Sequence, residues 1–466
     1  MSSNATTDES VPWYKLMNKH HWFVFTVASL AWLFDCLDQQ LFILARGSAI
    51  AALMPKGTDP AVLKEWGGYA TSIFVAGWAM GGLIFGSIGD KIGRAKTLTL
   101  TVLIYSLCTG LSAFSKGIID FSIYRFLTGL GVGGVFGLSV ALVADSVPDR
   151  ARPHALGLLQ ALSAVGNVTA GLIAVTIGYM ETTSIAPGSA WRYMFVIGAL
   201  PAFLCVFIQM RLKEPEKWVQ AKAAGKISGV KFGSYTALLG DARWRGRAIV
   251  GMLMCVAAVV GLWGIGFFSP ELINDVVGKI LKEQGVPPEK LAGNRTMWTG
   301  INMILQNIGA FFGMIVFTKL AAKHGRKPVF VMAYICAMLA TAGVFKFLDQ
   351  KSDIFWMIPI MGFFQLALFA GFAIYLPELF PVSLRSTGTS FCYNVGRFIA
   401  ASGPFTLGLL TAKLSEGATT PEAKLEAFRN ACAGLSLIFL LGLAALPFAP
   451  ETKGKPLPED TDLAKA

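Results

Sequence analysis

Long apolar segments alternate with short polar ones along the whole chain. The hydrocarbon core of a bilayer is about 30 Å thick, so an α-helix needs roughly 20 apolar residues to cross it. Segments of this length, bounded by charge, proline or glycine, occur at residues 22–46, 66–88, 96–115, 118–143, 154–180, 191–211, 247–268, 298–318, 328–348, 354–376, 387–412 and 427–449. The pattern predicts an all-α integral membrane protein with about twelve transmembrane helices.

Positive charge concentrates in alternate loops, such as those holding Lys91 and Arg94, Arg150 and Arg152, or Lys319 and Lys323. Such loops stay on the cytoplasmic side, so we expect both termini there. The longest polar gap divides the apolar segments into two sets of six. The expected organisation is a cytoplasmic tail at 1–21, a six-helix bundle at 22–211, a cytoplasmic linker at 212–246, a second six-helix bundle at 247–449 and a cytoplasmic tail at 450–466.

Composition supports this class. Hydrophobic residues make up 54% of the 466 residues and charged residues 15%, which is more apolar surface than a water-soluble core can hide. The net charge of +12 lies in loops, where it faces anionic lipid, so we expect no nucleic-acid partner. The seven cysteines lie in apolar segments, and no histidine or acid cluster has metal-ligand spacing. We therefore expect neither a disulfide framework nor a metal site.

Residues 86–96 read GSIGDKIGRAK, which resembles the signature loop of the major facilitator superfamily. Gly93 allows a tight turn, Asp90 can accept hydrogen bonds from a neighbouring helix N-terminus, and Arg94 keeps the loop cytoplasmic. A weaker copy, KHGRK, surrounds Arg326, with Ala322 at the position of the acid. The two cytoplasmic latches are therefore expected to be unequal.

Further motifs resemble the sugar porters and their relatives, which include aromatic-acid:proton and other metabolite:proton symporters and organic-ion carriers. They are RFLTGLG at 125–131, WRYMF at 191–195, EPEKW at 214–218, PELFP at 377–381 and PETKG at 450–454. The resemblance implies two pseudo-symmetric six-helix bundles. It also implies a cytoplasmic latch built from Asp90, Gly93, Arg94, Glu216, Arg326, Glu378 and Arg385.

Few charged residues fall inside the predicted helices, and each is costly there. Asp35 and Asp38 share a face of the first helix, and Arg125 lies in the fourth. Asp38 matches the protonatable acid of proton-coupled sugar porters and Arg125 its partner, which implies a proton switch. A static buried pair is the alternative. Asp35 resembles the first acid of the Asp-Gly-x-Asp motif of aromatic-acid symporters, with Cys36 replacing the glycine, and either a coupling or a structural role is open.

Arg397 lies in the middle of the eleventh predicted helix, one turn after Tyr393 and Asn394. A guanidinium presents a fork that matches a carboxylate, so we interpret Arg397 as an anion clamp. The alternative is a gate in which Arg397 pairs with Asp35 or Asp38 across the cavity.

Gln160 and Asn167 match positions where sugar porters bind hydroxyl groups, which by itself favours a sugar. The seventh predicted helix is too apolar for a polyol, because Trp263 and Phe267 replace polar residues there. This cavity suits a compact carboxylate with an apolar body. The predicted substrate-binding residues are Arg397, Gln160, Asn167, Trp263, Asn394, Tyr393 and Phe267.

The sequence thus predicts a secondary active transporter, a proton symporter of a small organic anion such as a monocarboxylate or aromatic acid, working by alternating access. Alternatives are a proton-independent facilitator or exchanger, a carrier of organic cations, drugs or sugars, and a ligand-binding membrane receptor. No nucleophile and base have workable spacing, so we do not expect an enzyme. We expect a monomer in the inner or plasma membrane, with protons as coupling ion and no other cofactor.

Overall fold

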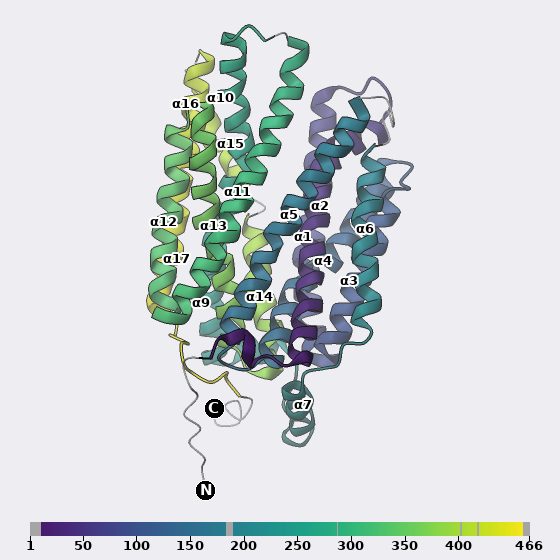
Figure 1. Cartoon of the computed structure of the whole chain (residues 1–466), viewed down its shortest axis with the longest axis vertical. Coiled ribbons are helices and arrows are strands. Elements are labelled where there is room, and N and C mark those ends of the chain that lie inside the picture. Colours follow the sequence, from purple (N-terminus) through teal and green to yellow (C-terminus); the bar gives the residue numbers. More distant parts are fainter. Residues whose placement is uncertain (1–10, 183–189, 287, 401–402, 417–418, 460–466) are drawn as a thin grey trace.

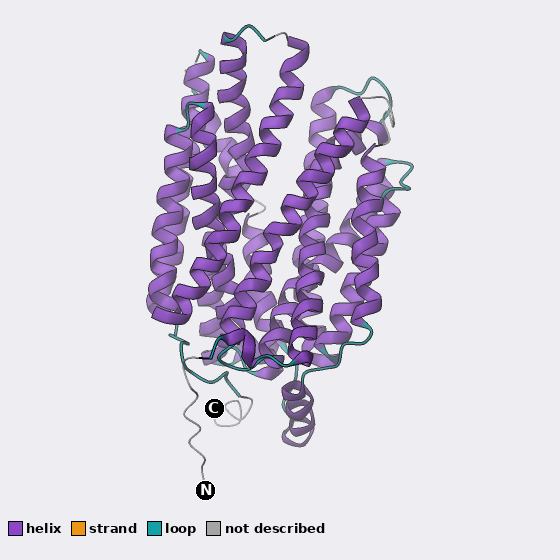
Figure 2. Ribbon diagram, viewed as in Figure 1, coloured by secondary structure: helices purple, strands orange, loops and turns teal. Residues whose placement is uncertain are grey.

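The computed structural model describes residues 11–182, 190–286, 288–400, 403–416 and 419–459. Within these ranges the chain forms helices and loops and no strand (Figure 2). Helices are expected in a bilayer, because each one satisfies its own backbone hydrogen bonds where no water is available.

The first half of the chain forms long helices joined by short loops (Figure 1). They are α1 (Lys19–Leu53), α2 (Pro60–Ile92), α3 (Arg94–Ser112), α4 (Ile118–Ser146), α5 (Arg152–Thr182) and α6 (Ala190–Gln209), preceded by the short helix η1 (Trp13–Leu16). Two further helices, α7 (Glu216–Ser228) and α8 (Tyr235–Gly240), lie in the segment between the halves.

The second half has more interruptions than the first. Its helices are α9 (Ala242–Val259), the π-helical turn η2 (Val260–Ile265), η3 (Gly266–Phe268), α10 (Ser269–Glu283), α11 (Pro288–His324), α12 (Arg326–Phe347), α13 (Lys351–Leu379), η4 (Val382–Leu384), α14 (Arg385–Ala400), α15 (Gly403–Leu414), α16 (Pro421–Leu435), η5 (Ser436–Ile438), α17 (Phe439–Ala445) and η6 (Leu446–Phe448).

Every predicted apolar segment coincides with one helix or with consecutive helices. Ten helical segments of the described chain are long and apolar enough to cross a membrane. The remaining two predictions, 191–211 and 387–412, coincide with α6 and with α14 and α15. The helices extend beyond the apolar stretches, as α11 does with its 37 residues, because a helix need not end where the hydrocarbon ends. The chain is a polytopic membrane protein.

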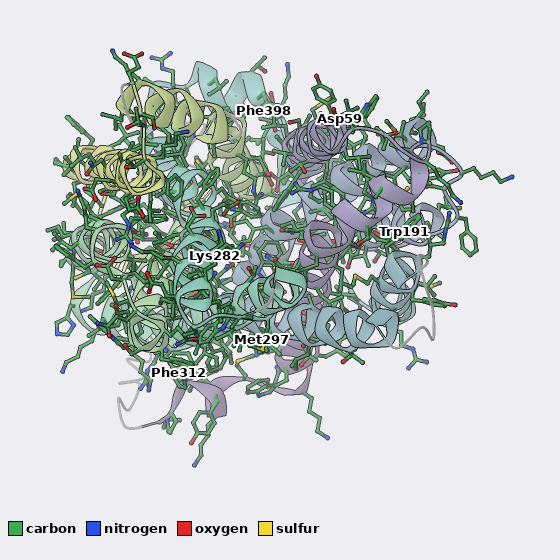
Figure 3. The ribbon with its side chains drawn as sticks, turned by 90° about the horizontal axis from the view of Figure 1, so that it is seen from above. Asp59, Trp191, Lys282, Met297, Phe312 and Phe398 are labelled. Atoms are coloured by element: carbon green, nitrogen blue, oxygen red, sulfur yellow. The ribbon has the colours of Figure 1, made fainter. Side chains whose placement is uncertain are left out.

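The two halves lie side by side. Seen along the long axis, the purple and blue helices of the first half occupy one side and the green and yellow helices of the second half the other (Figure 3). The purple chain before α1 and the yellow chain after α17 lie at the end of the molecule that carries α7 (Figure 1). We call this end the α7 end.

Glycines set equivalent helix contacts in both halves. A Cβ on Gly77 or Gly81 of α2 would lie 2.3 or 2.0 Å from a backbone oxygen of α4, and a Cβ on Gly309 or Gly313 of α11 would lie 1.9 or 2.0 Å from one of α13. Gly129 and Gly133 of α4 are equally close to the backbone of α2. The glycines of α4 therefore serve close helix packing, as expected from their position within a span.

Candidate functional site

The two acidic residues of α1 are fully buried but have different surroundings. Asp38 accepts a hydrogen bond from Thr109 Oγ1 of α3 at 2.8 Å, and its electrostatic partner is Arg125 of α4. Asp35 accepts one from Gln39 Nε2 at 3.0 Å, and its cationic neighbour is Arg397 of α14. Asp38 therefore faces its own half of the molecule, whereas Asp35 faces the other half.

The predicted direct pairing of Asp38 with Arg125 is not formed in this structure. Arg125 donates instead to Ser112 Oγ, at 3.0 Å from Nε and 2.6 Å from Nη2, and to Thr128 Oγ1 at 3.0 Å. Thr109 and Ser112 are one turn apart on α3, so this helix supplies one hydroxyl to the acid and one to the base. Asp38 Oδ2 and Arg125 Nη1 are buried and have no hydrogen-bond partner among the described residues.

Arg397 is 5% exposed and lies between aromatic rings. Its guanidinium carbon is 3.7 Å from the ring centroid of Trp78 in α2 and 4.3 Å from that of Tyr393. Its Nη1 donates to Asn394 Oδ1 at 2.9 Å, while Nε has no partner among the described residues. No salt bridge to Arg397 occurs in the described part of the chain, and Asp35 is the acidic side chain that interacts with it electrostatically.

Aromatic side chains from both halves surround this guanidinium. Trp263, in the π-helical turn of the seventh span, meets the Trp78 ring edge to face at 5.6 Å. Phe136 of α4 stacks on Tyr393 at 4.0 Å and also contacts Trp32 at 5.1 Å. π-helical turns inside helices frequently occur at functional sites. The predicted site residue Phe267 has a side chain that lies outside the described residues.

The two amides predicted to bind substrate lie differently. Asn167 Nδ2 of α5 donates to Asn307 Oδ1 of α11 at 2.8 Å, a bond that joins the two halves. Gln160 is buried, and its Oε1 has no partner among the described residues. Gln160 therefore has a free acceptor, whereas Asn167 is already engaged.

Trp78 was not among the predicted site residues. It precedes Gly82 and Gly86 by four and eight residues, so the three share one face of α2. A Cβ on Gly82 would lie 2.0 Å from Asn394 Nδ2, and one on Gly86 would lie 2.5 Å from Ser390 Cβ. The four-residue spacing of Trp78, Gly82 and Gly86 was the sequence signal that Trp78 lies on the face of α2 that contacts α14.

The α7 end is closed by charges that join the halves. Asp90 of α2 accepts from the N–H groups of Ser386 and Thr387, at 3.2 and 2.8 Å, and so caps α14. Asp145, at the end of α4, forms salt bridges with Arg94 of its own half and with Arg385 of the other. Gly93 adopts φ 125° in the turn between α2 and α3, as its motif requires.

The equivalent cluster in the second half stays within that half. Arg326 binds Glu378 at 2.7 Å, and Glu378 also accepts from Thr452 Oγ1 at 2.6 Å. Glu451 caps α12 by accepting from the N–H groups of Arg326 and Lys327 at 3.0 and 2.9 Å. The two latches are thus unequal, because Asp145 reaches across the halves and Glu378 does not.

Two acids of this region differ from the prediction. Glu216 is exposed in the first turn of α7, and Glu214 makes the latch contacts instead, accepting from the N–H groups of Arg94 and Lys96 at 2.8 and 3.0 Å. Asp145 was missed, although DSVP at 145–148 and ELFP at 378–381 repeat the same acid-to-proline spacing. That internal repeat identifies Asp145 as the counterpart of Glu378.

Comparison with known proteins agrees with this architecture. The family model described as Major Facilitator Superfamily matches residues 43–279. A putative metabolite transport protein of Haemophilus influenzae is 27% identical over 95% of this chain and 99% of its own length, and the cis,cis-muconate transport protein of Acinetobacter baylyi is 28% identical over 86% and 90%. The structure of the proton:xylose symporter XylE superposes with a TM-score of 0.73 at 16% identity, covering 95% of this chain and 99% of XylE.

Proposed function

The chain belongs to the Major Facilitator Superfamily, and we propose that it is a secondary active transporter that moves a small organic anion, a monocarboxylate or aromatic acid, together with a proton. It is a transporter rather than an enzyme. The observation that carries the proposal is the buried Arg397, whose Nε is without a partner among the described residues.

A guanidinium inside a membrane protein is costly unless its charge is balanced. Rings cover Arg397, Asn394 occupies one of its N–H groups, and Asp35 interacts with it without an ion pair. A carboxylate fits the remaining edge, since guanidinium and carboxylate form strong charge-assisted hydrogen bonds. An apolar body then meets aromatic walls instead of the amides that a polyol needs.

The proton site in this proposal is Asp38, with Arg125 as its partner and Asp35 as a second candidate. Asp38 and Arg125 are bound to neighbouring hydroxyls of α3, and each retains one unpartnered polar atom in the described structure. A small side-chain movement, or a water molecule, could join or separate them. Protonation of Asp38 would remove a negative charge from the first half while Arg397 holds the substrate.

Alternating access would require the α7 end to open. In our proposal this end is cytoplasmic and the protein lies in the inner or plasma membrane as a monomer. The contacts of Asp145 with Arg385, and of Asp90 with the start of α14, would have to break for substrate release on that side. The contacts of Asp145 and Asp90 with the other half would then favour closure of this end in the absence of ligand.

The similarity to known transporters also supports the proposed substrate class. A muconate carrier matches most of the chain, and muconate is an organic acid. XylE resembles this chain in fold at low identity, which carries no weight for a sugar substrate. The apolar seventh span and the buried arginine both favour an acid over a sugar.

The direct test is uptake of radiolabelled benzoate, muconate, xylose and an organic cation into proteoliposomes, with and without an inward proton gradient. We expect accumulation of a carboxylate only with the gradient. Asp38→Asn should abolish accumulation, and Arg397→Ala should abolish carboxylate binding measured in detergent. Matched controls are Asp241→Asn, since asparagine also caps a helix, and Arg245→Ala, an exposed arginine.

Other outcomes separate the alternatives. Carboxylate uptake that does not depend on the proton gradient would indicate a facilitator or exchanger. Competition by cations or xylose, with no effect of carboxylates, would identify a different cargo. Saturable binding in detergent without flux in vesicles would indicate a receptor.

A further inference from the structure

We propose that Trp78 is a specificity-determining residue that, with Tyr393, confines a carboxylate on Arg397 to the plane of the guanidinium. The site then selects acids whose carboxylate is conjugated with a flat body, and it disfavours acids with a tetrahedral carbon beside the carboxylate. This inference rests on the proposed function, because it assumes that Arg397 binds the carboxylate.

The rings of Trp78 and Tyr393 both contact the Arg397 guanidinium. Both lie within stacking distance of the guanidinium carbon of Arg397, at 3.7 and 4.3 Å. The ring contacts of Trp78 are with Phe74 and Trp263, whereas those of Tyr393 are with Phe136 and Phe369. The two rings therefore belong to separate clusters, one around α2 and one around α14, and in our proposal they cover the two faces of the guanidinium.

Covered faces leave only the edges of the guanidinium open. A carboxylate that binds an edge lies in the guanidinium plane, because the N–H groups point outward in that plane. The indole of Trp78 is larger than the guanidinium it covers, so it also covers part of whatever binds beside it. A flat acid fits such a slot, and a puckered ring or an α-substituent is too thick for it.

The walls of this slot are held in place. Trp78 is 2% exposed and Tyr393 2% exposed, and Phe136 stacks on Tyr393 from behind. One turn from Trp78, Gly82 lies directly against Asn394, which occupies Nη1 of Arg397. The same contact thus sets the distance between α2 and α14 and directs the carboxylate to the Nε edge. A thick ligand cannot push the walls apart without shifting packed helices.

Unsatisfied donors also point to a ligand. The indole Nε1 of Trp78 and Nε of Arg397 are both buried, and neither has a hydrogen-bond partner within the described ranges. Leaving buried N–H donors unpaired is unfavourable, and each unmet donor costs about 1 to 3 kcal/mol. An anion with two oxygens can satisfy such donors.

The test compares a flat acid with two acids that have a tetrahedral carbon beside the carboxylate. Uptake of benzoate is measured in proteoliposomes with a proton gradient, in competition with cyclohexanecarboxylate and with mandelate. We expect wild type to prefer benzoate over both competitors by about tenfold or more. Trp78→Leu should reduce this preference to within about threefold, because the slot loses one wall. Trp78→Phe should keep most of the preference and bind benzoate about three- to tenfold more weakly, because it lacks the N–H group.

Trp66→Leu is the matched control, since Trp66 lies on the same helix in an apolar groove with Ile73, Ile119 and Phe126, away from Arg397. It should leave the preference unchanged. Binding in detergent gives the same comparison for any variant that is purified folded but does not transport. If wild type shows proton-driven uptake but no preference among the three acids, this inference is overturned and the proposed function still stands. A failure to transport any carboxylate would overturn both.

Discussion

Asp35 and Asp38 lie one turn apart on α1, yet Asp35 faces Arg397 of the opposite half and Asp38 faces Arg125 of its own half. One helix thus presents one acid to the predicted substrate site and another to a polar network inside the first bundle. Neutralising each acid should have a different effect, which makes the pair a sensitive test of the mechanism.

Neutralising Asp38 should uncouple transport from the proton gradient. Asp38→Asn keeps the shape of the side chain and can still bond Thr109, but it cannot exchange a proton. We expect gradient-driven accumulation to fall to background while exchange of substrate across the membrane persists. Loading vesicles with substrate and following counterflow measures the second activity. Loss of both activities in a folded protein would contradict the separation of roles.

Neutralising Asp35 should strengthen carboxylate binding. Asp35 is an acidic neighbour of Arg397, so its charge competes with the charge of a bound anion. With Asp35→Asn we expect about tenfold tighter binding at a pH where Asp35 carries its charge in wild type, equivalent to about 1.4 kcal/mol. Calorimetry in detergent at several pH values measures this change. The affinity of wild type should approach that of the variant as pH falls, and a variant that binds more weakly would argue for a direct structural role.

Removing the charge of Asp145 should loosen the α7 end. Asp145 compensates Arg94 and Arg385, and all three side chains are buried. Breaking a buried pair by removing one partner typically costs about 3 to 5 kcal/mol. In Asp145→Asn we expect the amides of Ser386 and Thr387, which bond Asp90, to exchange hydrogen at least tenfold faster. Hydrogen exchange with mass spectrometry detects this.

Asp149 supplies the matched control for that experiment. It pairs with Arg152 but is 68% exposed, so its salt bridge contributes little. Asp149→Asn should leave exchange at the start of α14 unchanged. Equal effects of the two substitutions would show that net charge, and not the bridge between halves, controls this end.

Acid should release the cap of α12. Burial tends to raise the pKa of Glu451, but four backbone N–H groups outweigh it and hold the pKa below its ordinary value of 4.5. A depressed pKa in the folded state means that the carboxylate stabilises the fold above pH 4.5 and that this stabilisation is lost as pH falls through the folded value. We expect the amides of Arg326 and Lys327 to exchange faster below about pH 4, relative to the intrinsic rate.

Glu451→Gln should show rapid exchange of these amides already at pH 7 and little further change on acidification. The exposed Glu416→Gln variant should behave like wild type. If acid does not alter exchange at α12 in wild type, the carboxylate of Glu451 does not contribute the cap.

Several features of the candidate site depend on how helices rotate and tilt against one another. The sequence identified Asp35, Asp38, Arg125 and Arg397 because charge is costly within a span. It did not reveal that hydroxyls of α3 hold Asp38 and Arg125 apart, since that depends on which face α3 turns toward α1 and α4. Trp78 was overlooked because its sequence signal, the four-residue spacing from Gly82 and Gly86, also occurs in helices that only pack closely.

The sequence by itself determined the membrane class, the helical segments and the division into two halves, because these follow from runs of about 20 apolar residues and from the placement of loop charges. It also determined which buried charges needed an explanation. Only the tertiary structure decided that Asp145 joins the halves, that Glu214 rather than Glu216 caps α3, and that Trp78 covers Arg397. These are contacts between side chains distant in sequence, and their existence depends on the approach of whole helices, which glycines such as Gly82 permit.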